Sequence, residues 1–383
     1  MFYPAYINLQ NRKCLVIGGG TVAERKVVSM LISGGDVTVV SPDATELVAF
    51  LAEIGSIRWH KRDLIQGDTN GYFLVCAATD FITINSAVFT EAHETNNIRL
   101  VNVVDVIPQC TFAAASVVTD GEVMLSISTS GKSPATSRRI REHFEEMLNA
   151  SSLYTLGYEN GKPVSVGDLG LPYPVYLLLN NRKCVVLCDH KTPEIQRRIT
   201  LLRLCDANVI CLSPDEVKSQ DFENAFLVIS TEKTYLENCL ENDSQFIYEL
   251  LDDQNAGTHF TPNLIIDDDL IVSISAKNGN QICQTEDLFV KLKHLFENNG
   301  FGAYINLLGT RRSEVLEAFP TSKMRADFFE TLIGHVADTS KTCCLSLTDQ
   351  NCTAECLFNW VRHGKIDQAN TLITNLLNEQ RAY

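Results

Sequence analysis

Short apolar runs alternate with amphipathic stretches along the first 112 residues. Four runs have the length and branched side chains typical of buried parallel strands, at Cys14–Ile17, Val37–Val40, Phe73–Ala77 and Leu100–Val104. Between them, apolar residues recur at helical spacing in Ala23–Ser33, Glu46–Ile54 and Ile82–Thr95. The alternation predicts an α/β fold with a Rossmann-like, doubly wound parallel sheet, whose ligands bind beyond the carboxyl ends of the strands.

A glycine-rich turn lies between the first predicted strand and the first predicted helix. Gly18, Gly20 and Ala23 fit a G-x-G-x-x-A pattern, and Thr21 and Val22 open the helix. Such a turn lets the backbone approach a pyrophosphate and points free helix N–H groups at it. A purely structural turn is the alternative, but the position between strand and helix favours a dinucleotide site.

Polar residues follow three of the predicted strands. Ser41 and Asp43 follow the second strand, where the ribose of a dinucleotide is held, and no arginine adjoins them to receive a 2′-phosphate. The cofactor predicted is therefore NAD rather than NADP. Thr79 and Asp80 are predicted to line its nicotinamide side, although Thr-Asp also commonly caps a helix. Asp105 ends the fourth strand and is a candidate proton acceptor or a turn cap before Pro108.

The character of the sequence changes after Thr111. Ser116–Ser128 reads as a hairpin that turns at Asp120-Gly121, and Thr129–Pro134 reads as a loop. The stretch Ala135–Leu148 is an amphipathic helix with a basic start. Residues 151–172 are rich in glycine and lack a period, so they are predicted to be a linker.

The chain then repeats itself. Tyr173–Leu187 matches Tyr3–Ile17 at nine of fifteen positions, and weaker matches continue as far as Ser275. This pattern indicates a tandem duplication. In the second copy Cys188-Asp-His190 replaces Gly18-Gly-Gly20. Because Asp189 would repel a pyrophosphate and no glycine allows close approach, the second copy is expected to keep the fold and to lose the cofactor.

Four regions follow from these patterns. They are a dinucleotide-binding module over residues 1–150, the linker over 151–172, the degenerate second copy over 173–298 and a helical region over 299–383. The last shows helical periodicity in Arg311–Leu316, Arg325–Val336, Thr353–His363 and Gln368–Gln380.

The charge and the cysteine content of the chain argue against several classes of binding partner. A net charge of −15 argues against nucleic acid and against an anionic membrane surface. No apolar run approaches the ~20 residues needed to cross a bilayer, and no signal peptide is visible. The thirteen cysteines form no CxxC pair and the eight histidines show no ligand spacing. A reduced, cytoplasmic protein without a metal site is expected.

The ordered motifs resemble those of the precorrin-2 dehydrogenase / sirohydrochlorin ferrochelatase family of siroheme synthesis. The likeness covers residues 3 to about 148, and it rests on Gly18–Lys26, Val39–Pro42, Ala77–Asp80, Asn102–Asp105 and Ser126–Pro134 with the basic helix that follows. It implies NAD-dependent oxidation of precorrin-2 to sirohydrochlorin. In this family the aspartate of Asn-Val-Val-Asp is implicated in the dehydrogenation, which points to Asp105.

The resemblance also implies how a polycarboxylate substrate would be held. Asn102, Ser128 and Thr129 fall on family motif positions, with Thr129 in place of a serine. Lys132, Arg138 and Arg141 belong to the basic cluster beside the predicted site and suit carboxylate pairing. The alternative for the cluster is a solvated helix face that Glu142, Glu145 and Glu146 balance.

Two further functions remain open at this level. Some family members also insert ferrous iron as a substrate, so a bifunctional dehydrogenase and ferrochelatase is one alternative. The second copy without its glycines, and Thr129 in place of a serine, would also suit a non-catalytic sensor that binds NAD or the tetrapyrrole. The family's hairpin segments pair two chains in a homodimer, and a tandem copy could supply both halves as a pseudo-dimer within one chain.

Overall fold

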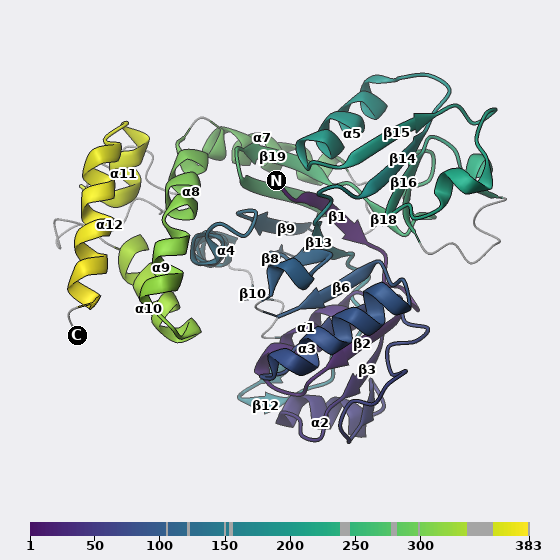
Figure 1. The fold of residues 1–383 in the computed structure, drawn as a ribbon, viewed down its shortest axis with the longest axis horizontal. Coiled ribbons are helices and arrows are strands. Elements are labelled where there is room, and N and C mark those ends of the chain that lie inside the picture. Colours follow the sequence, from purple (N-terminus) through teal and green to yellow (C-terminus); the bar gives the residue numbers. More distant parts are fainter. Residues whose placement is uncertain are drawn as a thin grey trace. The chain divides into compact units, whose positions relative to one another are not determined.

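The computed structural model describes residues 1–104, 106–120, 123–148, 151–152, 156–237, 246–276, 282–297, 299–334 and 355–381. Figure 1 labels the helices and strands along the chain. The chain divides into two compact units. Unit 1 comprises Met1–Ala115, Ser151–Pro262 and Ser275–Gln281, and unit 2 comprises Ser116–Ala150, Asn263–Ile274 and Ile282–Tyr383. The units join segments that are distant in the sequence, whereas the four predicted regions are consecutive; those boundaries remain predictions.

Unit 1 contains the predicted parallel sheet, with strand order β4-β3-β2-β5-β6. The strands are β2 (Lys13–Ile17), β3 (Asp36–Val40), β4 (Arg58–His60), β5 (Leu74–Ala77) and β6 (Leu100–Val103). The crossovers carry α1 (Thr21–Ile32), α2 (Glu46–Glu53), α3 (Ile82–Phe89) and the π-helical turn η1 (Thr90–Thr95). The strand order reverses between β2 and β5, which is where a doubly wound sheet opens a ligand crevice. The α/β prediction is confirmed.

A second parallel sheet of unit 1 has the order β15-β14-β16-β17. Its strands are β14 (Lys183–Leu187), β15 (Asn208–Leu212), β16 (Leu227–Ser230) and β17 (Ile247–Leu250), with α5 (Pro193–Leu204) and the short turns η4 (Ser219–Phe222) and η5 (Lys233–Leu236). This order is that of the first sheet without its outer strand. The match agrees with the repeat in the sequence, from which duplication remains an interpretation.

The two copies exchange strands in an antiparallel sheet of order β18-β1-β13-β7. Its strands are β1 (Tyr3–Ile7), β7 (Phe112–Ala114), β13 (Tyr173–Leu177) and β18 (His259–Phe260). Ala5 lies opposite Val175, and Tyr3 opposite Leu177. Since Ala5 and Val175 occupy equivalent positions in the repeat, β1 and β13 form a self-complementary pair of the kind found at a two-fold axis.

Unit 2 combines an antiparallel sheet with helices. The sheet contains β8 (Ser116–Asp120), β9 (Val123–Ser128), β20 (Leu270–Ala276) and β19 (Asn263–Asp267) in that order. The helices are α4 (Pro134–Leu148), α7 (Ile282–Phe296), α8 (Phe301–Thr310), α9 (Arg312–Ala318), α10 (Ser322–Ile333), α11 (Leu357–Arg362) and α12 (Ile366–Arg381). One buried cluster joins sheet residues such as Val118 and Val272 to helix residues such as Phe144 and Phe296. The predicted hairpin therefore forms a core with the C-terminal helices.

The remaining elements are short. They are β10 (Ser151–Ser152), β11 (Tyr158–Glu159), β12 (Lys162–Pro163) and the turn η2 (Ile107–Gln109). The antiparallel β11–β12 pair lies within the stretch predicted as a linker. Gly157 packs there against the side chain of Leu47 on α2, so part of the stretch is docked on the first copy.

Candidate functional site

The first glycine of the turn is required by a close backbone approach. Gly18 has φ +112°, and a Cβ atom there would lie 2.3 Å from the carbonyl oxygen of Ala78. Its N–H donates to the carbonyl oxygen of Val40 over 3.0 Å. Only glycine adopts this conformation without strain in so small a space. Gly18 thus holds the β2–α1 turn against the β5–α3 turn at the switch point of the sheet.

The two following glycines serve different purposes. A Cβ atom on Gly19 would lie 2.0 Å from the carbonyl oxygen of Asp43, so the loop after β3 closes over this residue. Sequence reasoning missed Gly19, although three consecutive glycines where the pattern needs two were the signal. A Cβ atom on Gly20 would meet nothing within 4 Å. Gly20 faces open space at the mouth of the crevice.

The amino end of α1 is open to an anion. Gly20 is the N-cap and provides no side-chain cap, and the N–H of Glu24 makes the bond back to the Gly20 carbonyl at 2.9 Å. The N–H groups of Thr21, Val22 and Ala23 therefore precede the first intrahelical bond. Thr21 and Val22 are exposed and Ala23 is buried against the sheet. The residues fit a dinucleotide pyrophosphate.

Ser41 and Asp43 lie at the carboxyl end of β3, beside the glycine turn. Ser41 is buried, and its carbonyl oxygen accepts from the indole N–H of Trp59 at 3.0 Å. Asp43 is exposed. Of the two, Asp43 has the carboxylate and the accessibility that a ribose hydroxyl requires.

Thr79 is held by a buried asparagine. Its hydroxyl donates to Oδ1 of Asn85 over 2.7 Å, and Nδ2 of Asn85 donates to the Thr79 carbonyl over 2.9 Å. The N–H of Phe81 donates to the Thr79 hydroxyl over 3.2 Å. These bonds define the loop at the end of β5, whereas Asp80 is exposed. Thr79 thus shapes the edge of the crevice, and the contacts of Thr79 and Asp80 with the nicotinamide stay predictions.

Asn102 also has local partners. It is 7% exposed; its Oδ1 accepts from the ammonium of Lys26 at 2.6 Å, and its Nδ2 donates to the Phe112 carbonyl at 2.9 Å. Lys26 on α1 is half-buried. The predicted substrate contact of Asn102 stays a prediction, and this geometry favours a role in joining α1, β6 and β7. The proposed proton acceptor Asp105 lies outside the described residues.

The substrate-binding residues predicted after the hairpin belong to unit 2, and the cofactor residues belong to unit 1. Ser128 and Thr129 are buried, and their hydroxyls accept from the N–H groups of Ser130 and Ser133 at 3.1 and 3.2 Å. They stabilise the loop before α4. The ammonium of Lys132 contacts the carboxylate of Asp269 and lies 2.5 Å from Oδ1 of Asn306.

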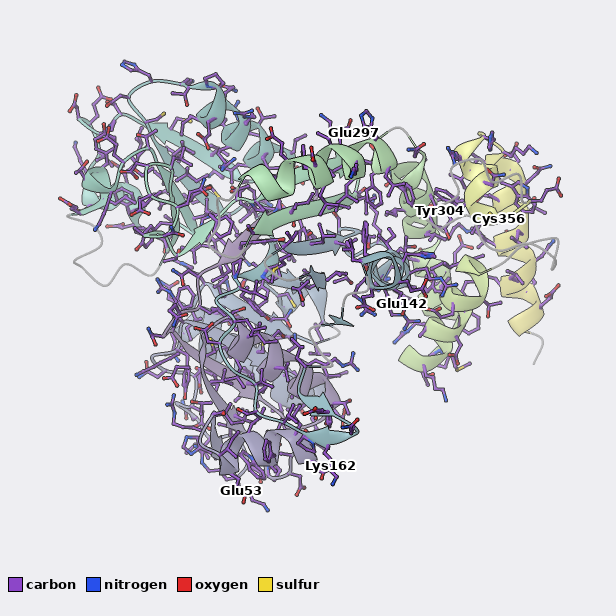
Figure 2. All side chains as sticks on the ribbon, turned by 180° about the vertical axis from the view of Figure 1, so that it is seen from behind. Glu53, Glu142, Lys162, Glu297, Tyr304 and Cys356 are labelled. Atoms are coloured by element: carbon purple, nitrogen blue, oxygen red, sulfur yellow. The ribbon has the colours of Figure 1, made fainter. Side chains whose placement is uncertain are left out.

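The arginines of α4 are paired with carboxylates. Arg138 contacts Glu330 on α10 and lies 3.5 Å from Glu142, which is labelled on α4 in Figure 2. Arg141 bonds Glu145 at 2.6 Å. The charges of these residues are thus locally balanced, as the alternative for the basic cluster predicts, and their binding of a polycarboxylate remains a prediction.

The second copy has a different turn at the position of the glycines. The hydroxyl of Tyr235 donates to the carboxylate of Asp189 over 2.6 Å, and this bond raises the pKa of the tyrosine. At α5, the hydroxyl of Thr192 caps the N–H of Ile195, and Pro193 supplies no N–H at all. At this helix end one backbone N–H is capped by Thr192 and another is absent at Pro193, so the end does not fit a pyrophosphate.

A buried ionic cluster joins the second copy to β1. Glu249 is fully buried and accepts from Arg198 at 3.0 Å and from the N–H and hydroxyl of Thr261 at 3.0 Å each. The Thr261 hydroxyl also lies 2.7 Å from that of Tyr3. Burial alone would raise the pKa of Glu249, but Arg198 holds it below its usual value. By strand register and helix position, this pair replaces Lys26 and Asn102 of the first copy.

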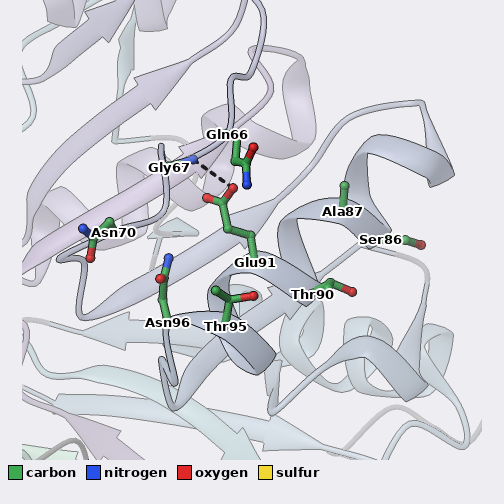
Figure 3. A pocket seen from close by; sticks show the side chains of 9 residues that line it. All are labelled: Gln66, Gly67, Asn70, Ser86, Ala87, Thr90, Glu91, Thr95 and Asn96. Atoms are coloured by element: carbon green, nitrogen blue, oxygen red, sulfur yellow. Dashed lines mark hydrogen bonds between the residues drawn. The ribbon is translucent and has the colours of Figure 1, made fainter.

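One cavity of about 590 Å³ lies elsewhere on the first sheet (Figure 3). Its lining includes Gly67 and Asn96, and its carboxylate, Glu91, is already bonded to the N–H groups of Gly67 and Thr69 at 2.9 and 3.0 Å. The loop leads into the amino end of β5, opposite the cofactor edge. Glu91 therefore stabilises this loop.

The described part of the chain has neither a cluster of metal ligands nor a membrane-spanning helix. No group of three or more His, Cys, Asp or Glu side chains there could hold a metal ion. None of the helices described is long and apolar enough to cross a membrane.

Known proteins share the N-terminal part of this sequence. Residues 5–116 match the family described as "Putative NAD(P)-binding". Siroheme synthase 1 of Pectobacterium atrosepticum is 37% identical over 150 residues, which cover 39% of this chain and 31% of the relative. Siroheme synthase of Photorhabdus laumondii is 36% identical over 161 residues, covering 42% and 34%. The N-terminal part of this chain is therefore similar in sequence to a part of these two siroheme synthases.

The likeness to the family is partial in length. The chain spans about a third of the length of these curated relatives. Among solved structures, "SirC, precorrin-2 dehydrogenase" is 27% identical over 37% of this chain and 68% of that one, with a TM-score of 0.33. The matched family residues 5–116 include the whole glycine turn and the strands around it.

Proposed function

We propose that this protein uses NAD to oxidise precorrin-2 to sirohydrochlorin in siroheme biosynthesis. The observation that carries the proposal is the open glycine turn, within the segment that the chain shares with siroheme synthases. When bound, NAD supplies the hydride acceptor. The turn at Gly18–Gly20 and the N–H groups of α1 hold its pyrophosphate, and Asp43 holds a ribose.

Asp105 is the proposed proton acceptor. Removal of two hydrogens from the macrocycle releases a proton beside the hydride, and the carboxylate of Asp105, which follows the strand Leu100–Val103 in the sequence, is the group proposed to receive it. Lys132, Arg138 and Arg141 are proposed to bind substrate carboxylates only by exchanging their present partners. A reduced, cytoplasmic setting belongs to the same proposal, because the cysteines that the structure describes are free thiols.

The one-chain pseudo-dimer is proposed as the working form. Its support is the self-complementary pairing of β1 with β13, which joins equivalent segments of the two copies. Within the described residues, the first copy alone provides a glycine turn and an open helix end for the cofactor, so one cofactor per chain is expected.

Anaerobic incubation with enzymatically prepared precorrin-2 and NAD tests the reaction. Sirohydrochlorin and NADH are expected in equal amounts, and Asp105→Asn is expected to retain NAD binding while losing at least about a hundredfold in rate. Ferrous iron added afterwards distinguishes the bifunctional alternative by the appearance of siroheme. If NAD binds and precorrin-2 persists, the sensor function replaces the proposal.

A further inference from the structure

Three exposed apolar side chains lie at the starts of α1 and α3, the helices that follow the two strands at the switch point of the first sheet. Phe81 is 65% exposed and Ile82 is 70% exposed, both at the start of α3, and Val22 on α1 is 40% exposed. Single exposed apolar residues are ordinary, but here three occur at the one edge of the sheet where the glycine turn lies.

The backbone below Phe81 is fixed before any ligand arrives. Asn85 is buried and bonds the N–H, hydroxyl and carbonyl groups of Thr79, and the Thr79 hydroxyl receives the Phe81 N–H. The carbonyl of Phe81 accepts from the N–H of Asn85 at 3.0 Å. An exposed aromatic ring on so well-bonded a turn is preorganised for contact.

The second copy shows which space this position reaches. Tyr235 lies five residues after the end of β16, as Ile82 lies five after the end of β5. Its hydroxyl bonds Asp189, which stands where Gly19 stands in the first copy. A side chain at this position therefore extends over the glycine turn. In the first copy the equivalent position is Ile82, and Gly19, which stands in place of Asp189, has no side chain to bond it.

We infer that Phe81 and Ile82 form an apolar platform for the nicotinamide ring of NAD. The inference rests on the NAD binding proposed above. A dinucleotide with its pyrophosphate on α1 and its adenosine toward β3 extends its nicotinamide half toward β5, where these two residues begin α3. The platform covers one face of the ring, which leaves the other face for the substrate.

Binding of NAD is compared with binding of ADP-ribose, which lacks the nicotinamide. Phe81→Ala is expected to raise the Kd for NAD about tenfold, from loss of ring contact, and to leave the Kd for ADP-ribose within about twofold. Leu204→Ala is the matched control, since Leu204 is 57% exposed at the end of α5. It is expected to change neither constant.

The emission of bound NADH gives a second readout. A blue shift on binding to the wild type is expected to shrink in Phe81→Ala, because the reduced ring loses its apolar neighbour. Unchanged NAD binding in the variant would overturn the platform, and so would equal weakening of NAD and ADP-ribose, which would indicate a disturbed turn. Wild-type protein that binds neither compound would refute the proposed NAD binding itself, and with it the platform.

Discussion

The hydroxyl oxygens of Ser126 on β9 and Ser273 on β20 lie 2.5 Å apart, within hydrogen-bonding distance. The two serines are equivalent in the repeat: Ser126 pairs with Val117 on β8, and Ser273 pairs with Leu264 on β19. Equivalent residues meet in this way at the centre of an isologous interface. The pairing of Ala5 with Val175 has the same property in unit 1. Each unit thus contains, inside one chain, a contact typical of a symmetric dimer.

The protein is expected to be a monomer in solution. Because the β1–β13 and β9–β20 pairings are satisfied within the chain, a second chain has no free copy of these edges to bind. Analytical ultracentrifugation should give the mass of one chain, 42.6 kDa, across a wide concentration range. A stable species of twice that mass would contradict the pseudo-dimer.

Two glycine variants should separate folding from binding. Gly18→Ala places Cβ 2.3 Å from the Ala78 carbonyl at φ +112°, so a loss of about 3 kcal/mol or more of unfolding free energy is expected. Gly20→Ala meets nothing within 4 Å and should lose less than about 1 kcal/mol. Its Cβ would instead lie where a pyrophosphate approaches, so NAD affinity should fall about tenfold.

Denaturant titration and NAD titration of both variants provide the check. Equal destabilisation of Gly18→Ala and Gly20→Ala would contradict the open space next to Gly20. Full NAD affinity in a folded Gly20→Ala protein would remove this residue from the cradle.

His259 is expected to make the protein acid-sensitive. It is fully buried, and burial lowers its pKa to about 4; Glu249 and the backbone at Tyr248 oppose this shift, and Arg198 adds to it. In the unfolded chain the imidazole of His259 is protonated below about pH 6.5, whereas in the folded chain it is protonated only below about pH 4. Stability is therefore complete above pH 6.5 and falls toward pH 4 by about 3 kcal/mol.

The first copy suggests the control for this residue. Phe112 follows Thr111 as His259 follows Thr258, and both threonine hydroxyls accept from the preceding strand at 2.8 and 2.7 Å. Unfolding free energies of His259→Phe between pH 7 and pH 4.5 should show a flatter profile than the wild type. Parallel profiles would assign the acid sensitivity to other groups, of which Glu249 is the foremost.

The second copy is expected to bind no dinucleotide. Calorimetric titration should give one NAD per chain in the wild type. The double variant Asp189→Gly/Tyr235→Phe should still bind one, because Thr192 and Pro193 continue to occupy the helix end. Two sites in the wild type would show that the cap of α5 yields to a ligand.

Local periodicity predicted the parallel sheet well. The predicted strand at 14–17 is β2, and the predicted helix at 46–54 is α2 within one residue. The predicted helix at 82–95 divides into α3 and the π-helical turn η1. Apolar residues at this spacing suit an α-helix and a π-helix alike, so the pattern does not show where the α-helix gives way to the π-helical turn.

The long-range contacts were not predictable in the same way. Spacing placed Lys132 in a basic cluster, but its partner Asp269 is 137 residues away and becomes a neighbour only when the hairpins of the two copies pair. The repeat of Tyr3 at Tyr173 was visible, yet nothing in it shows that the two strands pair with each other. The motifs contain both Asn102 and Lys26, yet the sequence does not show that the ammonium of Lys26 donates to the amide oxygen of Asn102.

The most direct measurement is anaerobic NADH formation from precorrin-2 and NAD by the wild type and by Gly20→Asp. The aspartate would put a negative charge at the open end of α1, as Asp189 does beside α5. The proposal predicts turnover by the wild type and none by a folded Gly20→Asp protein. Wild-type protein that binds NAD and forms no NADH, or equal rates in both, would contradict it.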